Sequence, residues 1–215
     1  MIRSLVPALV FALAVPAFAK GGDAPKAADV KAAPAVWEID SAHTAATFSV
    51  RHMMVSKVRG EFGKVSGSVT VPGADFTKAT VEATIDASSI NTRDEKRDGH
   101  LKSPDFFDVA KFPTLTFKSK KIERAAAAGR HKMTGDLTIH GVTKEVAFDV
   151  EGPSPETKNP WGVGVVGASA TATVNRKDFG LNWNKALEAG GVLVGDEITI
   201  TLDVELNRKA PEAKK

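Results

Sequence analysis

Apolar and polar side chains alternate along most of this 215-residue chain, and a period of two is typical of strands that bury one face. Near the C-terminus, Ile198, Ile200, Leu202, Val204 and Leu206 alternate with polar side chains. The pattern predicts strands over residues 36–40, 44–52, 58–71, 79–86, 114–122, 131–140, 143–151, 162–174 and 197–206. Because the first two can form one bent strand, we expect eight or nine strands.

Short connections join several of these strands, such as Gly141-Val142 and the turn at residues 72–75. Neighbouring strands are therefore predicted to form antiparallel hairpins. Sustained alternation with little helix favours a closed antiparallel barrel, while a two-sheet sandwich is also compatible with the pattern. The predicted strands 58–71 and 162–174 would each span about 40 Å and contain several glycines, which permit bends. A barrel built from them would have an elongated interior.

Residues 90–117 break the alternation. Seven charges fall within the ten residues from Arg93 to Lys102. The chain then runs directly into four phenylalanines: Phe106, Phe107, Phe112 and Phe117. A charged cap next to an aromatic cluster is typical of a polar lid over an apolar interior. This segment therefore indicates a binding site before it indicates a catalytic one.

A short helical excursion is predicted within this segment, over about residues 93–110. Thr92 and Glu95 match a capping box, and Ser103-Pro104 matches a second helix start with proline at the first position. A helix this short is marginal by itself, so it must dock on the barrel, with Leu101 as its apolar anchor.

The two ends of the chain have a different character from the middle. Arg3, the apolar stretch 5–15 and Ala17-Phe18-Ala19 predict a signal peptide over residues 1–19, cleaved after Ala19. Residues 20–35 have few large apolar groups and are predicted to be a flexible segment, and residues 208–215 a charged tail. The folded domain is expected to span residues 36–207.

Composition removes several classes of protein. The chain has no cysteine, which excludes disulfides, a thiolate zinc site and a lipid-bearing N-terminal cysteine. Its 29 basic and 26 acidic residues give a net charge of +3 and are interspersed, so a nucleic-acid partner is not expected.

Catalytic and metal motifs are also missing from the sequence. The five histidines have no metal-ligand spacing, and Gly-x-Ser-x-Gly is absent. We therefore expect neither a metal nor a catalytic residue. The acids Asp94, Glu95 and Asp98 lie in a charge run of the kind that is usually solvated or paired.

Four stretches carry more specific motifs. They are Trp37–Thr44 with Phe48-x-Val50-x-His52 and Gly60-x-Phe62, Arg97–Val109 with Phe112-Pro113, Gly135–Thr143, and Arg176–Leu181. In this order they resemble the YceI-like polyisoprenoid-binding family over nearly all of residues 36–206. The resemblance implies an all-β, lipocalin-like, eight-stranded antiparallel β-barrel that is exported to the periplasm and is often dimeric. It also implies an elongated cavity that holds an isoprenoid chain, such as a quinone tail or a polyprenyl phosphate.

Candidate ligand-binding residues follow from the alternation and the resemblance together. We expect the inward side chains to line the cavity: Phe48, Val50, Val81, Phe117, Ile139 and Phe148. Phe106, Phe107 and Phe112 are expected at its gate beside Leu101, and Phe62 and Trp183 complete the apolar set. Trp37 stands where the family commonly has tyrosine, and its larger ring would shorten or reshape one end of the cavity.

Two interpretations remain open for the polar groups of the excursion. In the first, Arg97 and Asp98 fix the excursion to the barrel rim and His100 satisfies a buried backbone group. In the second, Arg97, His100 or His52 meets the polar head of a ligand whose tail lies inside.

The main hypothesis is a periplasmic binding or carrier protein, not an enzyme, with a bound isoprenoid lipid or quinone as ligand and no other cofactor. A homodimer and transient contact with inner-membrane proteins are its further candidate partners. One rival is an enzyme acting on an apolar substrate with His52 or His100 as general base. Another is a packed barrel without a cavity that serves as a partner or adhesion module.

Overall fold

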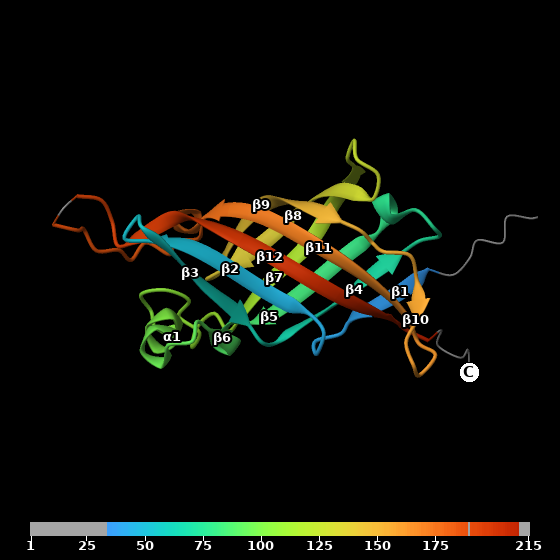
Figure 1. Ribbon diagram of the computed structural model, residues 1–215, viewed down its shortest axis with the longest axis horizontal. Coiled ribbons are helices and arrows are strands. Elements are labelled where there is room, and N and C mark those ends of the chain that lie inside the picture. The colour runs from blue at the N-terminus through green and yellow to red at the C-terminus, as the bar shows by residue number, and fades with distance from the viewer. Residues whose placement is uncertain (1–33, 189, 211–215) are drawn as a thin grey trace, which may run out of the picture. The chain divides into compact units, whose positions relative to one another are not determined.

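The computed structural model describes residues 34–188 and 190–210, in which the strands form one antiparallel sheet (Figure 1). The predicted signal peptide 1–19, most of the predicted flexible segment 20–35 and the end of the charged tail 208–215 lie outside the described residues. Within them, no helix has both the length and the apolar character needed to cross a membrane.

The described elements include the predicted strands and two short strands, β6 and β10, that were not predicted. The strands are β1 Ala35–Ile39, β2 Ala45–His52, β3 Ser56–Phe62, β4 Val65–Val71, β5 Thr80–Asp86, β6 Ile90–Asn91, β7 Thr114–Arg124, β8 Arg130–Ile139, β9 Val142–Glu151, β10 Thr157–Lys158, β11 Gly164–Asn175 and β12 Val194–Arg208. The helix is α1 Glu95–Lys102, and the 3-10 turns are η1 Phe76–Lys78, η2 Ala87–Ser89 and η3 Arg176–Phe179.

Eight of these strands close into a barrel. They pair in the order β11-β9-β8-β7-β5-β4-β1-β12, and β12 then pairs back with β11 from Asn207↔Val165 to Glu197↔Asn175. β2, β3 and β6 branch from β12, and β10 from β11. The eight-stranded antiparallel barrel is thus confirmed, and the sandwich that the alternation also allowed is not formed.

One long strand organises the closure. β12 has 15 residues, more than the predicted 197–206, and it pairs with β1 at its C-terminal end and with β2 over Val194–Asp203. β1 and β2 therefore lie end to end along the same neighbour, separated by a turn at residues 40–44. This arrangement matches the expectation that the first two strands act as one bent strand.

The prediction of a single strand over 58–71 is wrong. The chain breaks at Gly63 and Lys64, whose backbone N–H groups bond to the carbonyl and the hydroxyl of Ser89 at 3.2 Å each. β3 pairs with β2 and β6, whereas β4 pairs with β1 and β5. The break lets one stretch of chain change partners at the corner of the barrel.

The helical excursion is real, but its predicted caps are wrong. Asp94 is the N-cap of α1, and its Oδ1 accepts from the Arg97 N–H at 3.0 Å. Ser103 is the C-cap, and its hydroxyl donates to the His100 carbonyl at 2.7 Å, so Ser103-Pro104 begins no second helix. No residue of α1 is buried, because the sequence gives this helix no apolar stripe.

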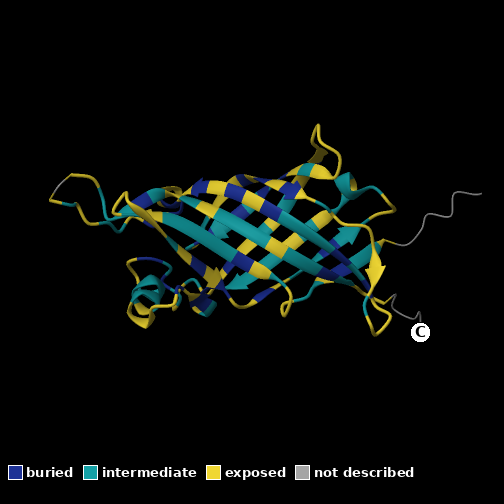
Figure 2. Ribbon diagram, viewed as in Figure 1, coloured by how far each residue is buried: buried dark blue, intermediate teal, exposed yellow. Residues whose placement is uncertain are grey.

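Inward and outward residues alternate around the barrel (Figure 2). A large buried cluster occupies most of the interior, and a smaller one joins Trp37, Val69, Val166 and Leu206 where β1, β4, β11 and β12 meet. The guanidinium of Arg208 lies over the Trp37 ring, 4.4 Å from its centroid. The smaller cluster fills the barrel interior at this position.

Candidate functional site

The barrel encloses a cavity of about 230 Å³. It extends along the barrel, from Thr44 and Leu206 near one end to Leu101 and Phe179 at the end that carries α1. Almost all of its lining residues are apolar, and the exceptions are Thr44, Thr47, Thr116, Ser169 and Arg176. Such an interior offers apolar contacts and few hydrogen-bonding groups, which suits an apolar chain.

The strand alternation places the expected wall residues on the cavity. Phe48, Val50, Val81, Phe117, Ile139 and Phe148 all line it. Many inward side chains, among them Phe48, Ile200 and Leu202, are only partly buried because they border open space. The barrel interior is therefore not fully packed, unlike the barrel expected for a pure partner module. Ligand contact by these residues remains a prediction.

Phenylalanine rings pack along the wall toward α1. Phe48 and Phe62 have ring centroids 5.8 Å apart, and the Phe62 and Phe107 rings meet edge to face at 5.7 Å. Farther along the barrel, Phe117 and Phe148 pack edge to face at 5.2 Å. These distances lie in the attractive range for aromatic pairs, so the rings form two aromatic groups on the wall.

The expected gate is only partly assembled. Leu101, Phe106 and Phe107 line the cavity, but Phe112 does not. Its ring packs on His140 at 4.6 Å and covers Gly141, where a Cβ would overlap the Phe112 ring. Because residues 103–113 are irregular, no period in the sequence could show which way this ring points.

Four other expected site residues lie off the cavity wall. Trp37 belongs to the smaller buried cluster together with Leu206, which does line the cavity, so its ring lies beyond the wall at that end. The effect of this ring on cavity length stays a prediction. His52 is the last residue of β2, paired with Val194. His100 and Trp183 pack against each other, with ring centroids 4.8 Å apart.

Arg97 also lies off the wall and serves the first of the two interpretations given for the excursion. Its Nε donates to the Thr92 hydroxyl and its Nη2 to the Thr92 carbonyl, each at 2.7 Å. The Thr92 N–H and hydroxyl donate in turn to Asp98 Oδ1. Arg97 and Asp98 therefore hold the buried Thr92, and through it they fix α1 to the end of β6.

The same interpretation also expected His100 to satisfy a buried backbone group, and this expectation is wrong. His100 Nε2 lies 2.9 Å from Asp105 Oδ2, and its ring packs edge to face on Phe106. Both partners of this ion pair are substantially exposed. The pair therefore sits outside the gate, behind the Phe106 ring that borders the cavity.

Arg176 is the charged residue that lines the cavity, and the sequence analysis did not include it among the site residues. The side chain is 3% exposed. Its guanidinium donates to the carbonyls of Gly195, Leu181 and Trp183, and Nη2 lies 3.3 Å from Asp196 Oδ1. Burial lowers the pKa of Arg176 and Asp196 opposes the shift, but a guanidinium remains charged. The Arg176–Leu181 motif was visible in the sequence, but nothing in it indicated burial.

A polar cluster lies on the outside of the barrel. His43 Nδ1 is 3.1 Å from Asp40 Oδ2 and 3.8 Å from Glu205 Oε1. Among the residues with described positions, Asp40, His43 and Glu205 form the group whose potential metal-ligand atoms lie within 4.8 Å of one another. Asp40 also accepts from Ala42 N–H and from the Asn207 amide, so the cluster has a structural role in closing the β1–β2 turn.

The closed antiparallel barrel around an apolar cavity defines a lipocalin-like binding barrel. Residues 37–206 match the family described as YceI-like domain. A UPF0312 protein of Staphylococcus aureus strain N315 is 42% identical over 169 residues, which cover 78% of this chain and 95% of that protein. The chain belongs to the YceI-like family.

Solved structures show the same fold. Burkholderia cenocepacia BcnA matches with a TM-score of 0.65 at 23% identity, over 78% of this chain and 98% of BcnA. A domain from Saccharophagus degradans, described as a polyisoprenoid-binding domain implicated in plant cell wall breakdown, matches with a TM-score of 0.58 at 14% identity, over 80% of this chain and 98% of that domain. At these identities the likeness establishes the fold.

Proposed function

We propose that this protein is a periplasmic carrier that holds a long isoprenoid chain, of quinone or polyprenyl type, inside its barrel. The observation that carries the proposal is the apolar cavity that follows the barrel from Thr44 to the α1 end. Family membership supports it, and a barrel of this fold is described as a polyisoprenoid-binding domain.

Transfer of the chain out of water supplies the driving force. Each buried CH₂-sized group contributes roughly 0.8 kcal/mol, and this gain is offset by the loss of rotational freedom in the tail. Since the wall offers almost no hydrogen-bonding side chains, it discriminates little between apolar tails. Selectivity would come from the length and width of the cavity.

Cavity size sets a condition on loading. A dry cavity of about 150 Å³ accommodates benzene. The present cavity, at about 230 Å³, is only moderately larger than that. A chain of several isoprene units therefore requires wall rings to change rotamer. Phe48, Phe62 and Phe107 are the candidates, because they contact one another mainly through tilted or edge-on rings.

Lipid extraction tests the proposal directly. Protein purified without detergent is extracted with organic solvent, and the extract is examined by mass spectrometry. We expect an isoprenoid lipid in stoichiometric amount. In Ala170→Leu the cavity is partly filled from β11 and the lipid should be reduced, whereas Thr171→Leu, on the exposed face of the same strand, should retain it. Absence of any apolar ligand from the native protein would refute the proposal.

The carrier function is proposed without a catalytic step. His52 and His100, the candidate general bases, both lie off the cavity wall, and His100 Nε2 faces Asp105. Incubation of the protein with its extracted lipid should return the lipid unchanged. A modified product that His100→Ala abolishes would support the enzyme instead.

Periplasmic location is part of the proposal and rests on residues 1–19. Mass spectrometry of the protein recovered from the periplasmic fraction should show a chain that begins at Lys20. Recovery of the uncleaved chain in the cytoplasmic fraction would contradict export.

A further inference from the structure

The β2–β3 turn exposes three apolar side chains in succession. Met53, Met54 and Val55 are 44%, 54% and 79% exposed. The turn lies beside residues 190–193: the Met53 N–H donates to the Leu193 carbonyl at 2.8 Å, and Met54 approaches Gly191. Together Met53, Met54 and Val55 with Leu187, Val192 and Leu193 form what we call the apolar tip.

Folding does not explain why methionine occupies this turn. Met53 and Met54 have φ values of 50° and 62°, and the Val55 N–H closes the turn on the His52 carbonyl at 3.1 Å. Two successive left-handed residues favour Asn-Gly, since other side chains are strained there. Strain retained at an exposed apolar position indicates a role outside the fold.

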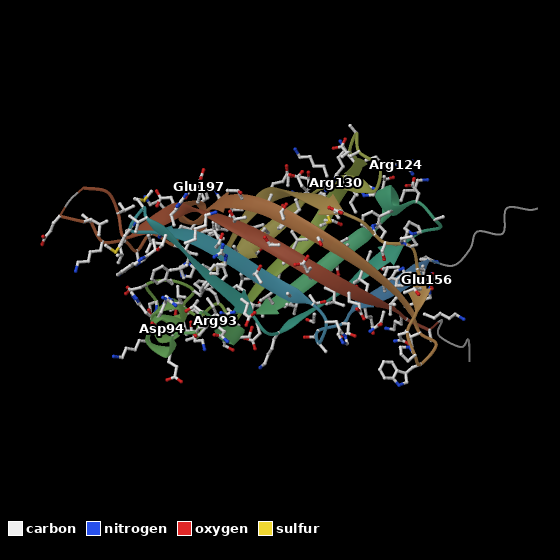
Figure 3. The ribbon with its side chains drawn as sticks, in the orientation of Figure 1. Arg93, Asp94, Arg124, Arg130, Glu156 and Glu197 are labelled. Atoms are coloured by element: carbon white, nitrogen blue, oxygen red, sulfur yellow. The ribbon has the colours of Figure 1, made fainter. Side chains whose placement is uncertain are left out.

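The apolar tip begins where the cavity ends. Val50 and Val194 line the cavity, and the chain passes from them within a few residues to Met53 and Leu193. The turn and residues 190–193 lie at the end of the barrel that carries α1 (Figure 1). Figure 3 shows Asp94 at this end and Glu156 at the opposite end, beside the β10–β11 connection.

Basic side chains flank the apolar tip. Arg51 and Lys57 lie on either side of the turn and Lys185 precedes Leu187, and all three are exposed. Glu188 is the acid beside the apolar tip, while Asp196, near Arg51, already pairs with Arg176 and Lys177, and Glu197 follows it. Within the described part of the chain, none of Arg51, Lys57 and Lys185 has an ion-pair partner. Exposed apolar side chains surrounded by cations suit the surface of an anionic bilayer.

We propose that the apolar tip docks on an anionic lipid bilayer, with Met53, Met54 and Val55 inserted among the headgroups and Arg51, Lys57 and Lys185 on lipid phosphates. The inference rests on the proposed carrier function for its purpose, because docking would bring the α1 end of the cavity to the membrane that holds the cargo. The bilayer, and not a second copy of the chain, is favoured by the cationic surround, which would repel its own copy.

A site-specific probe tests the proposal. The chain has no cysteine, so Met54→Cys in the protein without its predicted signal peptide 1–19 can carry one environment-sensitive fluorophore. Vesicles of phosphatidylcholine with phosphatidylglycerol should shift its emission to the blue, and phosphatidylcholine alone should shift it less. The matched control is Trp161→Cys, at an 83% exposed apolar residue between β10 and β11. A shift at position 161 and none at 54 would overturn the proposal.

Vesicle flotation gives the second measurement. Met53→Asn/Met54→Gly suits the turn geometry and should fold at least as stably as the wild type, yet bind these vesicles roughly tenfold more weakly. Lys57→Gln/Lys185→Gln should weaken binding roughly fivefold per cation at low salt, and less at high salt. Trp161→Ser should bind as the wild type does. Unchanged binding by the Asn-Gly variant would overturn docking.

Failure of docking can be told apart from failure of the carrier function. The Asn-Gly variant alters no cavity residue, so it should retain its extractable lipid. Normal vesicle docking by a protein that holds no lipid would refute only the carrier function. Normal lipid content without vesicle docking would refute only the docking of the apolar tip.

Discussion

At the residue scale, Arg176 shows how one buried cation can hold several loops. Its hydrogen bonds connect η3 to residues 181–183 and to the start of β12. In Arg176→Lys an ammonium cannot reach the same set of carbonyls, and buried acceptors lose their donors. We expect a loss of about 2–4 kcal/mol in the free energy of unfolding, measured by urea denaturation.

Lys177 provides the matched control for Arg176. Its Nζ bonds to the same Asp196 at 2.9 Å but is exposed. Lys177→Gln should therefore change the stability by less than about 0.5 kcal/mol. Equal losses in the two variants would show that Asp196, and not the carbonyl network, is what Arg176 stabilises.

His43 makes a different prediction, about pH. Its hydrogen bond to Asp40, with the charges of Asp40 and Glu205, raises the pKa of His43 above 6.5. The stabilisation from protonated His43 is thus complete below the unfolded-state pKa and disappears as the pH rises through the folded-state pKa. An NMR titration should show this raised pKa in the wild type and a lower one in Asp40→Asn. A wild-type pKa at or below 6.5 would contradict the contact.

Single residues also mark what sequence could and could not predict. Alternation assigned Phe48 and Phe148 to the inner face, because a strand fixes that direction for every second side chain. It could not show where along the strand the cavity stops. Trp37 faces its own buried cluster for that reason, and Phe112 lies in an irregular segment where no period applies.

At the element scale, α1 depends mainly on its polar connections, and Leu101 is the apolar side chain that it packs on the core. Thr92, 3% exposed, accepts from Arg97 and donates to Asp98. The composition of residues 92–95 indicated a helix start, but it could not distinguish Thr92 from Asp94 as the cap. Thr92 is buried directly after β6, where its hydroxyl bonds to Arg97 and Asp98, so Asp94 and not Thr92 caps the helix.

Thr92→Val separates these roles. The change preserves shape but removes the hydroxyl from both Arg97 and Asp98, so we expect a loss of about 1–3 kcal/mol. Hydrogen exchange of residues 92–103 should accelerate accordingly. Asp94→Ala removes only the cap and should cost about 1 kcal/mol. If Asp94→Ala accelerates exchange more than Thr92→Val, the cap and not the Thr92 contact anchors the helix.

At the scale of the whole barrel, the antiparallel pairing of neighbouring strands was predictable because alternation and short turns are local features of the sequence. The short strands β6 and β10 were not predicted. The partner change at Gly63 was not predictable either, since alternation continues across the break and only contact with Ser89 reveals it. The same limit applies to the closing pair β11–β12 and to the extra length of β12. Pairing between distant strands is a property of the closed barrel.

The width of the cavity can be changed by substituting the phenylalanines of its wall. If long chains enter by displacing rings, Phe62→Leu should admit a longer or bulkier chain, because it removes the ring between Phe48 and Phe107. The lipids extracted from Phe62→Leu should shift toward greater length, at a cost in ligand-free stability of about 1–2 kcal/mol. Phe112→Leu removes an equal ring outside the cavity and should leave the lipid profile unchanged. Identical profiles in the wild type and Phe62→Leu would show that this ring does not limit the chain, and an equal shift in Phe112→Leu would show that the effect is not local to the wall.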